Sequence, residues 1–170
     1  MSLHSVITEP AVERPAPGLG HLLQRVIAGV DWQSQVRYNA NARWFAPLAV
    51  DTLVDGVALE AWLLSWLPGQ RTGLHDHGGS AGAFAVVRGE LSEATVQTPS
   101  VGAPRLHHQI YQAGQHRPFG PRHLHEVLND GADPAVSIHV YAPRLARMTR
   151  YRWTENGPEV VAVEQAGTDW

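Results

Sequence analysis

Ten histidines and no cysteine among 170 residues define the chemistry that this chain can offer. Without a thiol there is no disulfide, thiolate zinc site or cysteine nucleophile, so a metal ion must be held by His, Asp or Glu. His75 and His77 flank Asp76 at the expected start of a strand. Residues i and i+2 of a strand project from the same face, so the two imidazoles could meet one metal ion.

The spacing around this His-Asp-His triplet resembles the first conserved motif of the cupin superfamily. The chain reads Gly69, five residues, the triplet, four residues, Gly82, six residues and Gly89. Gly82 stands where that motif usually has a glutamate ligand. The resemblance implies a small jelly-roll β-barrel whose inward-facing side chains converge on a metal at its mouth.

Two candidates for a third ligand lie downstream. The spacing from His125 to Asn129 resembles the end of the second cupin motif, whose histidine is the third protein ligand. His123 remains the rival, because it lies two residues earlier and on the same face if the strand is regular. The resemblance thus implies a metal held by His75, His77 and His125.

Three neutral histidines would leave the charge of a divalent ion uncompensated. The common non-haem iron oxygenase site combines two histidines with one carboxylate. A site without the carboxylate keeps its full positive charge and should favour an anionic, polarisable substrate ligand. A thiolate has both properties.

A second group of polar residues lies on one predicted strand. Ser137, His139 and Tyr141 alternate, so they should share a face and form a hydrogen-bonded chain in which serine orients histidine and histidine orients the phenol. With the histidine triad, the segment 135–143 resembles the cysteine dioxygenases, thiol dioxygenases of the cupin superfamily. The resemblance covers about residues 60–145.

This resemblance implies one Fe(II) per chain and transfer of both atoms of O2 to the sulfur of a small thiol, with L-cysteine favoured. Tyr141, His139 and Ser137 are the implied catalytic residues, the phenol stabilising charge as it develops. Another thiol, such as 3-mercaptopropionate or cysteamine, remains open. So do a non-catalytic cupin that binds a metal or ligand and, on fold grounds, a zinc-dependent hydrolase or isomerase.

Two further residues are candidates for substrate binding. Trp66 matches a family tryptophan that packs under the site, although a plain core role fits it equally. Arg43 could grip a carboxylate through its planar guanidinium, but it does not match the family pattern, and a surface charge is the alternative. Ala142-Pro143 resembles a pair that carries a cis bond in related enzymes. Gly82 stands where some members link a cysteine to the tyrosine, so Tyr141 should work unmodified, as in bacterial-type members.

The elements that position these residues follow from periodicity. Apolar residues at helical spacing predict one amphipathic helix over 19–30. With 16 Gly and 12 Pro, the remainder is typical of an all-β cupin of short strands. The predicted strands span 57–67, 82–88, 91–97, 106–112, 123–128, 135–141 and 147–153. We expect residues 1–17 to form a flexible leader and 18–170 a single cupin domain, with 154–170 either an edge strand or a tail.

Charge and hydropathy narrow the partners. A formal charge of -3 offers no basic face for nucleic acid. The start of the chain does not read as a signal peptide, and the most apolar stretch, 61–67, is too short to span a bilayer. We therefore expect a cytoplasmic protein without membrane contact, a monomer or small homo-oligomer. His107 and His108 could support the site from behind, but exposed positions fit them better.

Overall fold

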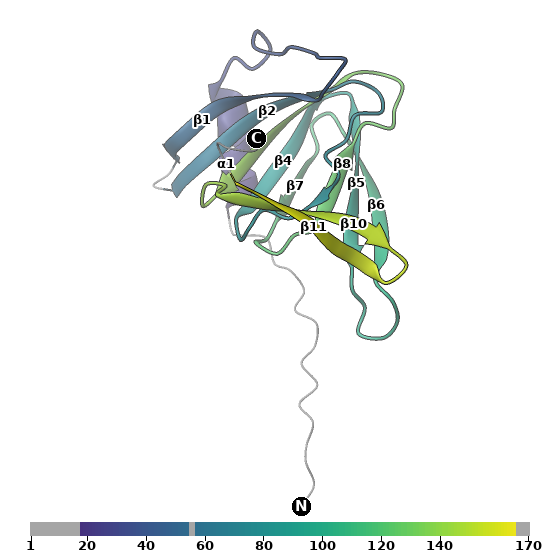
Figure 1. Cartoon of the computed structure of the whole chain (residues 1–170). Coiled ribbons are helices and arrows are strands. Elements are labelled where there is room, and N and C mark those ends of the chain that lie inside the picture. The colour runs from purple at the N-terminus through teal and green to yellow at the C-terminus, as the bar shows by residue number, and fades with distance from the viewer. Residues whose placement is uncertain (1–17, 55–56, 166–170) are drawn as a thin grey trace, which may run out of the picture.

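The structure, a computed structural model, describes residues 18–54 and 57–165. Within these ranges, helix α1 (Leu19–Gly29) lies against one of two antiparallel sheets (Figure 1). The first sheet has the order β1 (Trp44–Val54), β2 (Val57–Trp66), β9 (Ala135–Ala142), β4 (Ala81–Arg88) and β7 (His116–Phe119). The second has the order β11 (Gly157–Gln165), β10 (Arg147–Thr154), β3 (Leu74–His75), β8 (His125–Leu128), β5 (Glu90–Gln97) and β6 (Arg105–Gln112).

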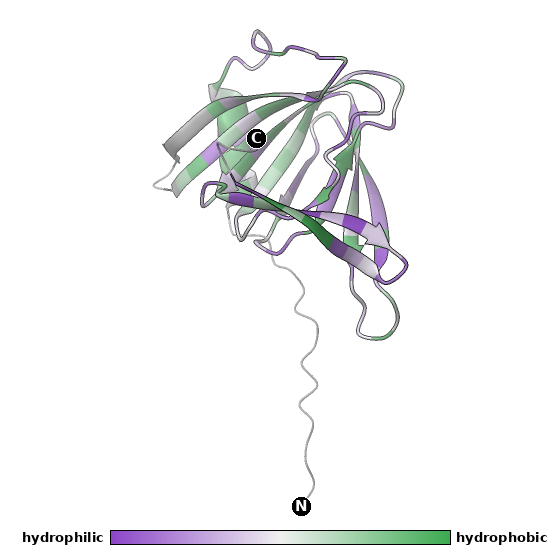
Figure 2. Cartoon of the chain, viewed as in Figure 1, coloured by the Kyte–Doolittle hydropathy of each residue, from purple (hydrophilic) through white to green (hydrophobic). Residues whose placement is uncertain are grey.

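The central strands of the first sheet are covered on both faces. The buried residues of α1 pack on alternate, mostly small or β-branched residues of β2, β4 and β9, among them Ala83, Ala85 and Ile138. Figure 2 shows this apolar layer, with hydrophilic residues along the outer strand β6. Because side chains alternate along a strand, the other face of β9 points between the two sheets. Ser137, His139 and Tyr141 lie on that inner face.

The second sheet carries the histidines. β3 pairs with β8 so that His75 stands directly opposite His125. β8 also pairs with β5, which places the inner-facing residues of three adjacent strands side by side. Two segments far apart in the chain are thereby brought to one point between the sheets.

The predicted all-β cupin class is confirmed, and each predicted strand is found within a few residues of its expected limits. Of the two alternatives for the end of the chain, residues 157–165 form an edge strand, β11. The predicted leader, residues 1–17, lies outside the described residues, and the single domain over 18–170 stays a prediction. Within the described ranges, no helix is long and apolar enough to span a membrane.

Two strands were not predicted. β1 contains Pro47 and β7 contains Pro118, and a proline inside a run argues against a central strand. Both lie at the edges of the first sheet, where a missing N–H costs no ladder bond if it faces outward. β8 is shorter than predicted, because it begins at His125 and leaves His123 in the preceding turn segment.

Candidate active site

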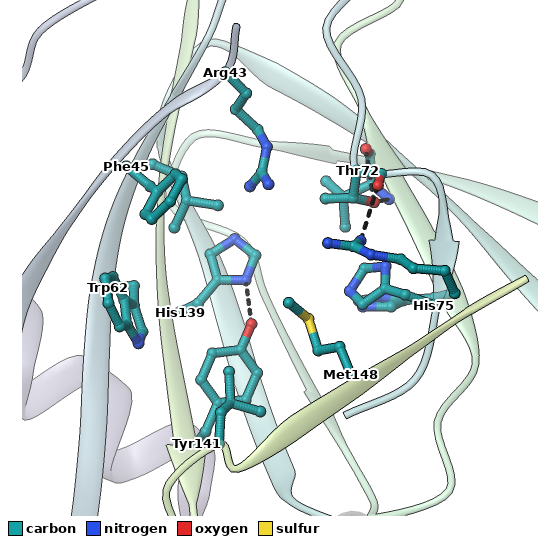
Figure 3. Close-up of a pocket in the computed structure, with 13 residues that line it drawn as sticks. Arg43, Phe45, Trp62, Thr72, His75, His139, Tyr141 and Met148 are labelled. Carbon is teal, nitrogen blue, oxygen red and sulfur yellow. Dashed lines mark hydrogen bonds between the residues drawn. The ribbon is translucent and has the colours of Figure 1, made fainter. Parts of the chain in front are cut away.

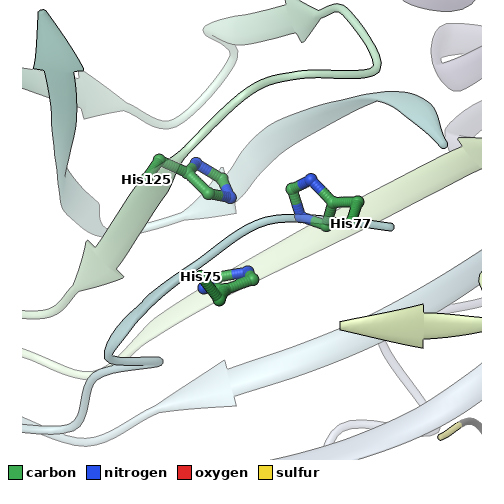
Figure 4. Close-up of side chains that lie close together, drawn as sticks. All are labelled: His75, His77 and His125. Atoms are coloured by element: carbon green, nitrogen blue, oxygen red, sulfur yellow. The ribbon is translucent and has the colours of Figure 1, made fainter. Parts of the chain in front are cut away.

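The structure brings His75, His77 and His125 together between the sheets (Figure 4). Their ring centroids lie 4.8–5.0 Å apart, and one ligand nitrogen from each ring falls within 4.8 Å of the other two. All three side chains are buried, with at most 4% of their surface exposed. The rings can therefore close around a single ion.

The hydrogen bonds of the triad leave nitrogens free at its centre. His75 Nδ1 lies 2.9 Å from the Gly73 carbonyl oxygen, and His125 Nδ1 lies 2.7 Å from Glu93 Oε1. Since both partners accept, each Nδ1 carries the hydrogen and each Nε2 presents a lone pair. Within residues 18–54 and 57–165, neither ring nitrogen of His77 has a hydrogen-bond partner although both are buried, which is costly unless something else satisfies them. A metal ion fits this donor set.

The protonation states also suit a metal. Burial lowers the pKa of His75 and His77 well below the ordinary value, and the neighbouring imidazoles lower it further. Burial lowers the pKa of His125 as well, although its bond to Glu93 opposes the shift. All three are neutral at pH 7, the form in which imidazole binds metals.

Asp76 fixes the segment that carries two of these histidines. β3 ends at His75, so strand alternation alone does not place His77 as the sequence argument assumed. Instead, Asp76 Oδ2 accepts from Tyr151 Oη at 2.7 Å, and Oδ1 accepts from the Gly78 amide at 2.9 Å. The Asp76 amide donates to the Thr149 carbonyl at 3.0 Å. The middle residue of the triplet therefore anchors it to β10.

Gly82 has no room for a side chain. A Cβ added there would lie 2.5 Å from Phe119 Cζ and 2.6 Å from the Val140 carbonyl oxygen. The Phe119 ring stacks on His77, with centroids 4.8 Å apart and planes at 21°. An aromatic ring thus occupies the place where a glutamate ligand would have to stand.

The rival ligand His123 is used elsewhere. Its Nε2 lies 2.8 Å from Glu93 Oε1, the same oxygen that His125 Nδ1 approaches. Burial would raise the pKa of Glu93, but the hydrogen bonds from His123 and His125 outweigh it and hold the pKa well below its usual range. Sequence reasoning missed Glu93. Glu93 lies two residues after buried Leu91 on a predicted strand, so the two side chains share a face of that strand. A charged residue on this apolar face was the signal that the sequence offered.

The predicted polar chain on β9 is present, and Trp66 extends it. Trp66 Nε1 donates to Ser137 Oγ at 2.9 Å, Ser137 Oγ lies 2.9 Å from His139 Nε2, and His139 Nδ1 lies 3.4 Å from Tyr141 Oη. An indole N–H only donates. The indole takes one lone pair of Ser137 Oγ, so the serine hydrogen is available to His139 Nε2, and His139 Nδ1 can then donate to the phenol. Tyr141 keeps its own hydrogen free to donate.

Two pKa shifts agree with these donor and acceptor roles. Burial lowers the pKa of His139 well below its usual value, so the ring is neutral. Burial also raises the pKa of Tyr141 above its usual value, so the phenol stays protonated.

A pocket opens above these residues (Figure 3). Six of its lining residues are apolar or largely so, namely Phe45, Trp62, Leu64, Val127, Leu145 and Met148. The other lining residues are polar, namely Arg43, Thr72, His75, His125, His139, Tyr141 and Arg150. Among the described residues no carboxylate lines it. The pocket should therefore receive an anion.

The two guanidinium groups of the pocket differ in their partners. Arg150 pairs with Glu164 at 2.7 Å and donates to the Thr72 carbonyl, so its charge is matched. Arg43 points into the pocket, and its Cζ lies 5.0 Å from the Trp66 ring centroid. Its Nε is buried and has no hydrogen-bond partner in the part of the chain that the structure describes. Burial lowers the pKa of Arg43 to about 10, which leaves it charged at pH 7. Trp66 is not among the residues that line the pocket, but it contacts Arg43 and Ser137.

The other histidines that the structure describes lie away from this site. His107 and His108 are exposed on β6, in agreement with the simpler of the two interpretations of these residues. His21 and His116 are exposed as well. His4 lies outside the described residues. The Ala142–Pro143 peptide bond is cis.

The match to a known family decides the class of protein. Residues 31–154 match the model of the cysteine dioxygenase type I family. The chain belongs to this family. It is therefore a thiol dioxygenase, an oxidoreductase of the cupin fold with a histidine-rich site suited to a metal ion. The predicted family and enzyme class are confirmed.

Solved structures agree on the fold. The protein TT1209 from Thermus thermophilus is 23% identical, with a TM-score of 0.56 over 68% of this chain and 96% of that one. A conserved protein with a double-stranded β-helix domain from Klebsiella pneumoniae is 19% identical, with a TM-score of 0.53 over 67% and 83%. An oxalate oxidase is 15% identical, with a TM-score of 0.50 over 77% and 61%. At these identities the likeness concerns the fold alone.

Proposed function

We propose that this enzyme binds one Fe(II) through His75, His77 and His125 and oxidises a small thiol that carries a carboxylate, L-cysteine first. The observation that carries the substrate assignment is Arg43, a half-buried side chain that lines the same pocket as His75 and His125. The reaction adds both atoms of O2 to sulfur, so that R–S⁻ becomes R–SO2⁻. The atoms balance without a further reductant.

Iron, when bound, would supply the centre at which thiolate and dioxygen meet and through which electrons pass from sulfur to oxygen. The protein supplies orientation and hydrogen bonds. His75 and His125 line the pocket floor, whereas Tyr141 lines it from β9 with its hydroxyl hydrogen free. The phenol can then donate to oxygen as negative charge builds up there.

Arg43 would hold the carboxylate of the substrate. A carboxylate in a largely apolar pocket costs several kcal/mol unless it is paired, and a guanidinium can pair with it bidentately. Stacking of Arg43 on the Trp66 ring keeps the long side chain in place. The thiol end of a bound cysteine would then point away from Arg43 toward the histidines.

A second substrate, 3-mercaptopropionate, is favoured by the charge of the pocket. Two guanidinium groups and no carboxylate line it within the described part of the chain. A free ammonium group would find no counter-ion there, so cysteine fits only if its amine is neutral, as it would be on the metal. The same argument makes cysteamine, which has an ammonium and no carboxylate, a poor substrate.

Oxygen consumption by the iron-loaded protein tests the proposal, with cysteine, 3-mercaptopropionate and cysteamine as substrates. Arg43→Ala should lower kcat/KM for the two carboxylates about 10- to 100-fold, mainly through KM, because a charged hydrogen bond contributes roughly 1.5–3 kcal/mol. Its activity toward cysteamine should not fall. Arg152→Ala, which removes an exposed guanidinium paired with Glu159, is the matched control and should leave all three unchanged.

Equal losses for all three thiols would show that Arg43 supports the fold instead. A wild-type preference for cysteamine would remove the carboxylate from the proposal. A folded, iron-loaded protein that oxidises none of the three would contradict this substrate assignment.

A further inference from the structure

A buried carboxylate stands directly behind the triad. Glu93 is 1% exposed, and both of its oxygens are used. Oε1 accepts from His125 Nδ1 at 2.7 Å and from His123 Nε2 at 2.8 Å. Oε2 accepts from Tyr111 Oη and from Arg117 Nε, each at 3.3 Å. A buried charge of this kind seldom adds stability over an apolar side chain of similar size, so its presence calls for another reason.

The packing at Gly82 supplies that reason. Phe119 fills the space beside this glycine, and its ring lies between two histidines, stacked on His77 at 4.8 Å and on His123 at 4.9 Å. A carboxylate cannot enter the triad from this strand. A carboxylate of the protein can therefore act on the iron site only from behind one of the histidines, without binding the metal itself.

The geometry points to Glu93 as the positioning residue of the iron site: through His125 it aims Nε2 at the metal and places a carboxylate, also paired with Arg117, directly behind that ligand. His123 shares the same carboxylate oxygen and so limits how much of the negative charge reaches His125. This inference rests on the proposed iron site. Partners of this kind, hydrogen-bonded to a ligand, raise its basicity and typically change metal affinity 10- to 100-fold.

The two residues should have opposite effects on the iron. Loss of the Glu93 charge makes the Nε2 lone pair of His125 a weaker metal ligand. Iron then binds more weakly, and the affinity for Fe(III) falls more than the affinity for Fe(II). Loss of the His123 donor leaves Glu93 Oε1 to His125 alone, which strengthens that bond and favours Fe(III). Mere damage to the fold would shift iron affinity downward in both variants.

The experiment compares Glu93→Gln and His123→Phe with wild type, by iron titration of the apo-protein and by the midpoint potential of the loaded protein without thiol. Glu93→Gln should bind Fe(II) about 10- to 100-fold more weakly. Its potential should rise by about 59 mV or more, the equivalent of a tenfold change in the ratio of Fe(II) to Fe(III) affinity. His123→Phe, which keeps a ring to stack on Phe119, should lower the potential.

Glu126→Gln is the matched control, since Glu126 lies on the same strand beside His125 but pairs with the exposed Arg71. It should behave as wild type. Potentials of Glu93→Gln and His123→Phe that equal wild type, or that move in the same direction, would overturn the inference. If Glu93→Gln fails to fold, the sign of the His123→Phe shift decides alone.

Two further results separate the inference from the proposal on which it rests. A wild-type protein that binds iron normally while Glu93→Gln is unchanged contradicts only the role of Glu93. A wild-type protein that binds no iron contradicts the proposed function and, with it, this inference. If the wild-type protein binds a second metal ion that Glu93→Gln does not bind, Glu93 and His123 are metal ligands themselves. That result also overturns the inference.

Discussion

A phenol can donate a hydrogen bond to a substrate only if its other partner donates to it. In this site the indole of Trp66, which lies 71 residues before Ser137 in the chain, favours that condition. Because Trp66 Nε1 can only donate, it takes a lone pair of Ser137 Oγ and leaves the serine hydrogen for His139 Nε2, so that His139 Nδ1 can donate to Tyr141. A core tryptophan therefore has a chemical task, although it does not touch the pocket.

Tyr141→Phe tests the donor at the end of this chain. The variant should bind iron as well as wild type, since Tyr141 is outside the triad. Its turnover should fall about 10- to 1,000-fold, the range lost when a single donor to developing charge is removed. Single-turnover oxygen consumption at saturating thiol measures the effect. Unchanged turnover would reduce Tyr141 to a packing residue.

At the scale of elements, local periodicity was enough to predict much of this arrangement. The alternation of Ser137, His139 and Tyr141 places all three on the inner face of β9, because a strand has a period of two. The same reasoning failed for His77, which lies beyond the end of β3 and depends on hydrogen bonds from Asp76 to β10. Those bonds join residues that are far apart in the chain, with Asp76 and Tyr151 separated by 75 positions.

Glu93 marks a second limit of sequence reasoning. Its partners His123 and His125 follow 30 and 32 residues later, and the pairing of β5 with β8 brings them together. No local pattern specifies that register. The strands β1 and β7 were missed for another reason, since their prolines are tolerated only because both strands are edges.

The contact between β4 and β7 can be tested at Gly82. Gly82→Ala would place a methyl group 2.5 Å from Phe119 Cζ and 2.6 Å from a backbone oxygen, so Phe119 must move. Such overpacking should lower the free energy of unfolding by about 1–3 kcal/mol. Chemical denaturation measures this change. Gly29→Ala, where an added Cβ meets nothing within 4 Å, is the control and should cause little change.

The partner substitution makes the Gly82 test specific. Phe119→Leu frees part of the space that the new methyl group needs, so the double variant should recover some of the lost stability. If the stability losses of Gly82→Ala and Phe119→Leu simply add in the double variant, the strain comes from the Val140 carbonyl alone.

At the scale of the whole molecule, the triad joins β3 and β8 of the second sheet to His77, whose ring nitrogens have no hydrogen-bond partner among the described residues. An apo-protein must leave both buried nitrogens of His77 unsatisfied, which costs stability. A metal that binds only the folded state recovers this loss. The site therefore couples the metal to the stability of the fold by mass action.

Thermal unfolding of apo- and metal-loaded protein measures this coupling. At a free metal concentration 100 times Kd, binding adds about 2.7 kcal/mol, which for a chain of this size should raise Tm by about 5–10 °C. His77→Leu should abolish the rise, yet its apo form should unfold at a higher temperature than wild-type apo-protein, because the unsatisfied nitrogens are gone. A His77→Leu protein that still gains stability from metal would show that the ion binds elsewhere, and one whose apo form is less stable would show that the wild-type ring is already satisfied without a metal.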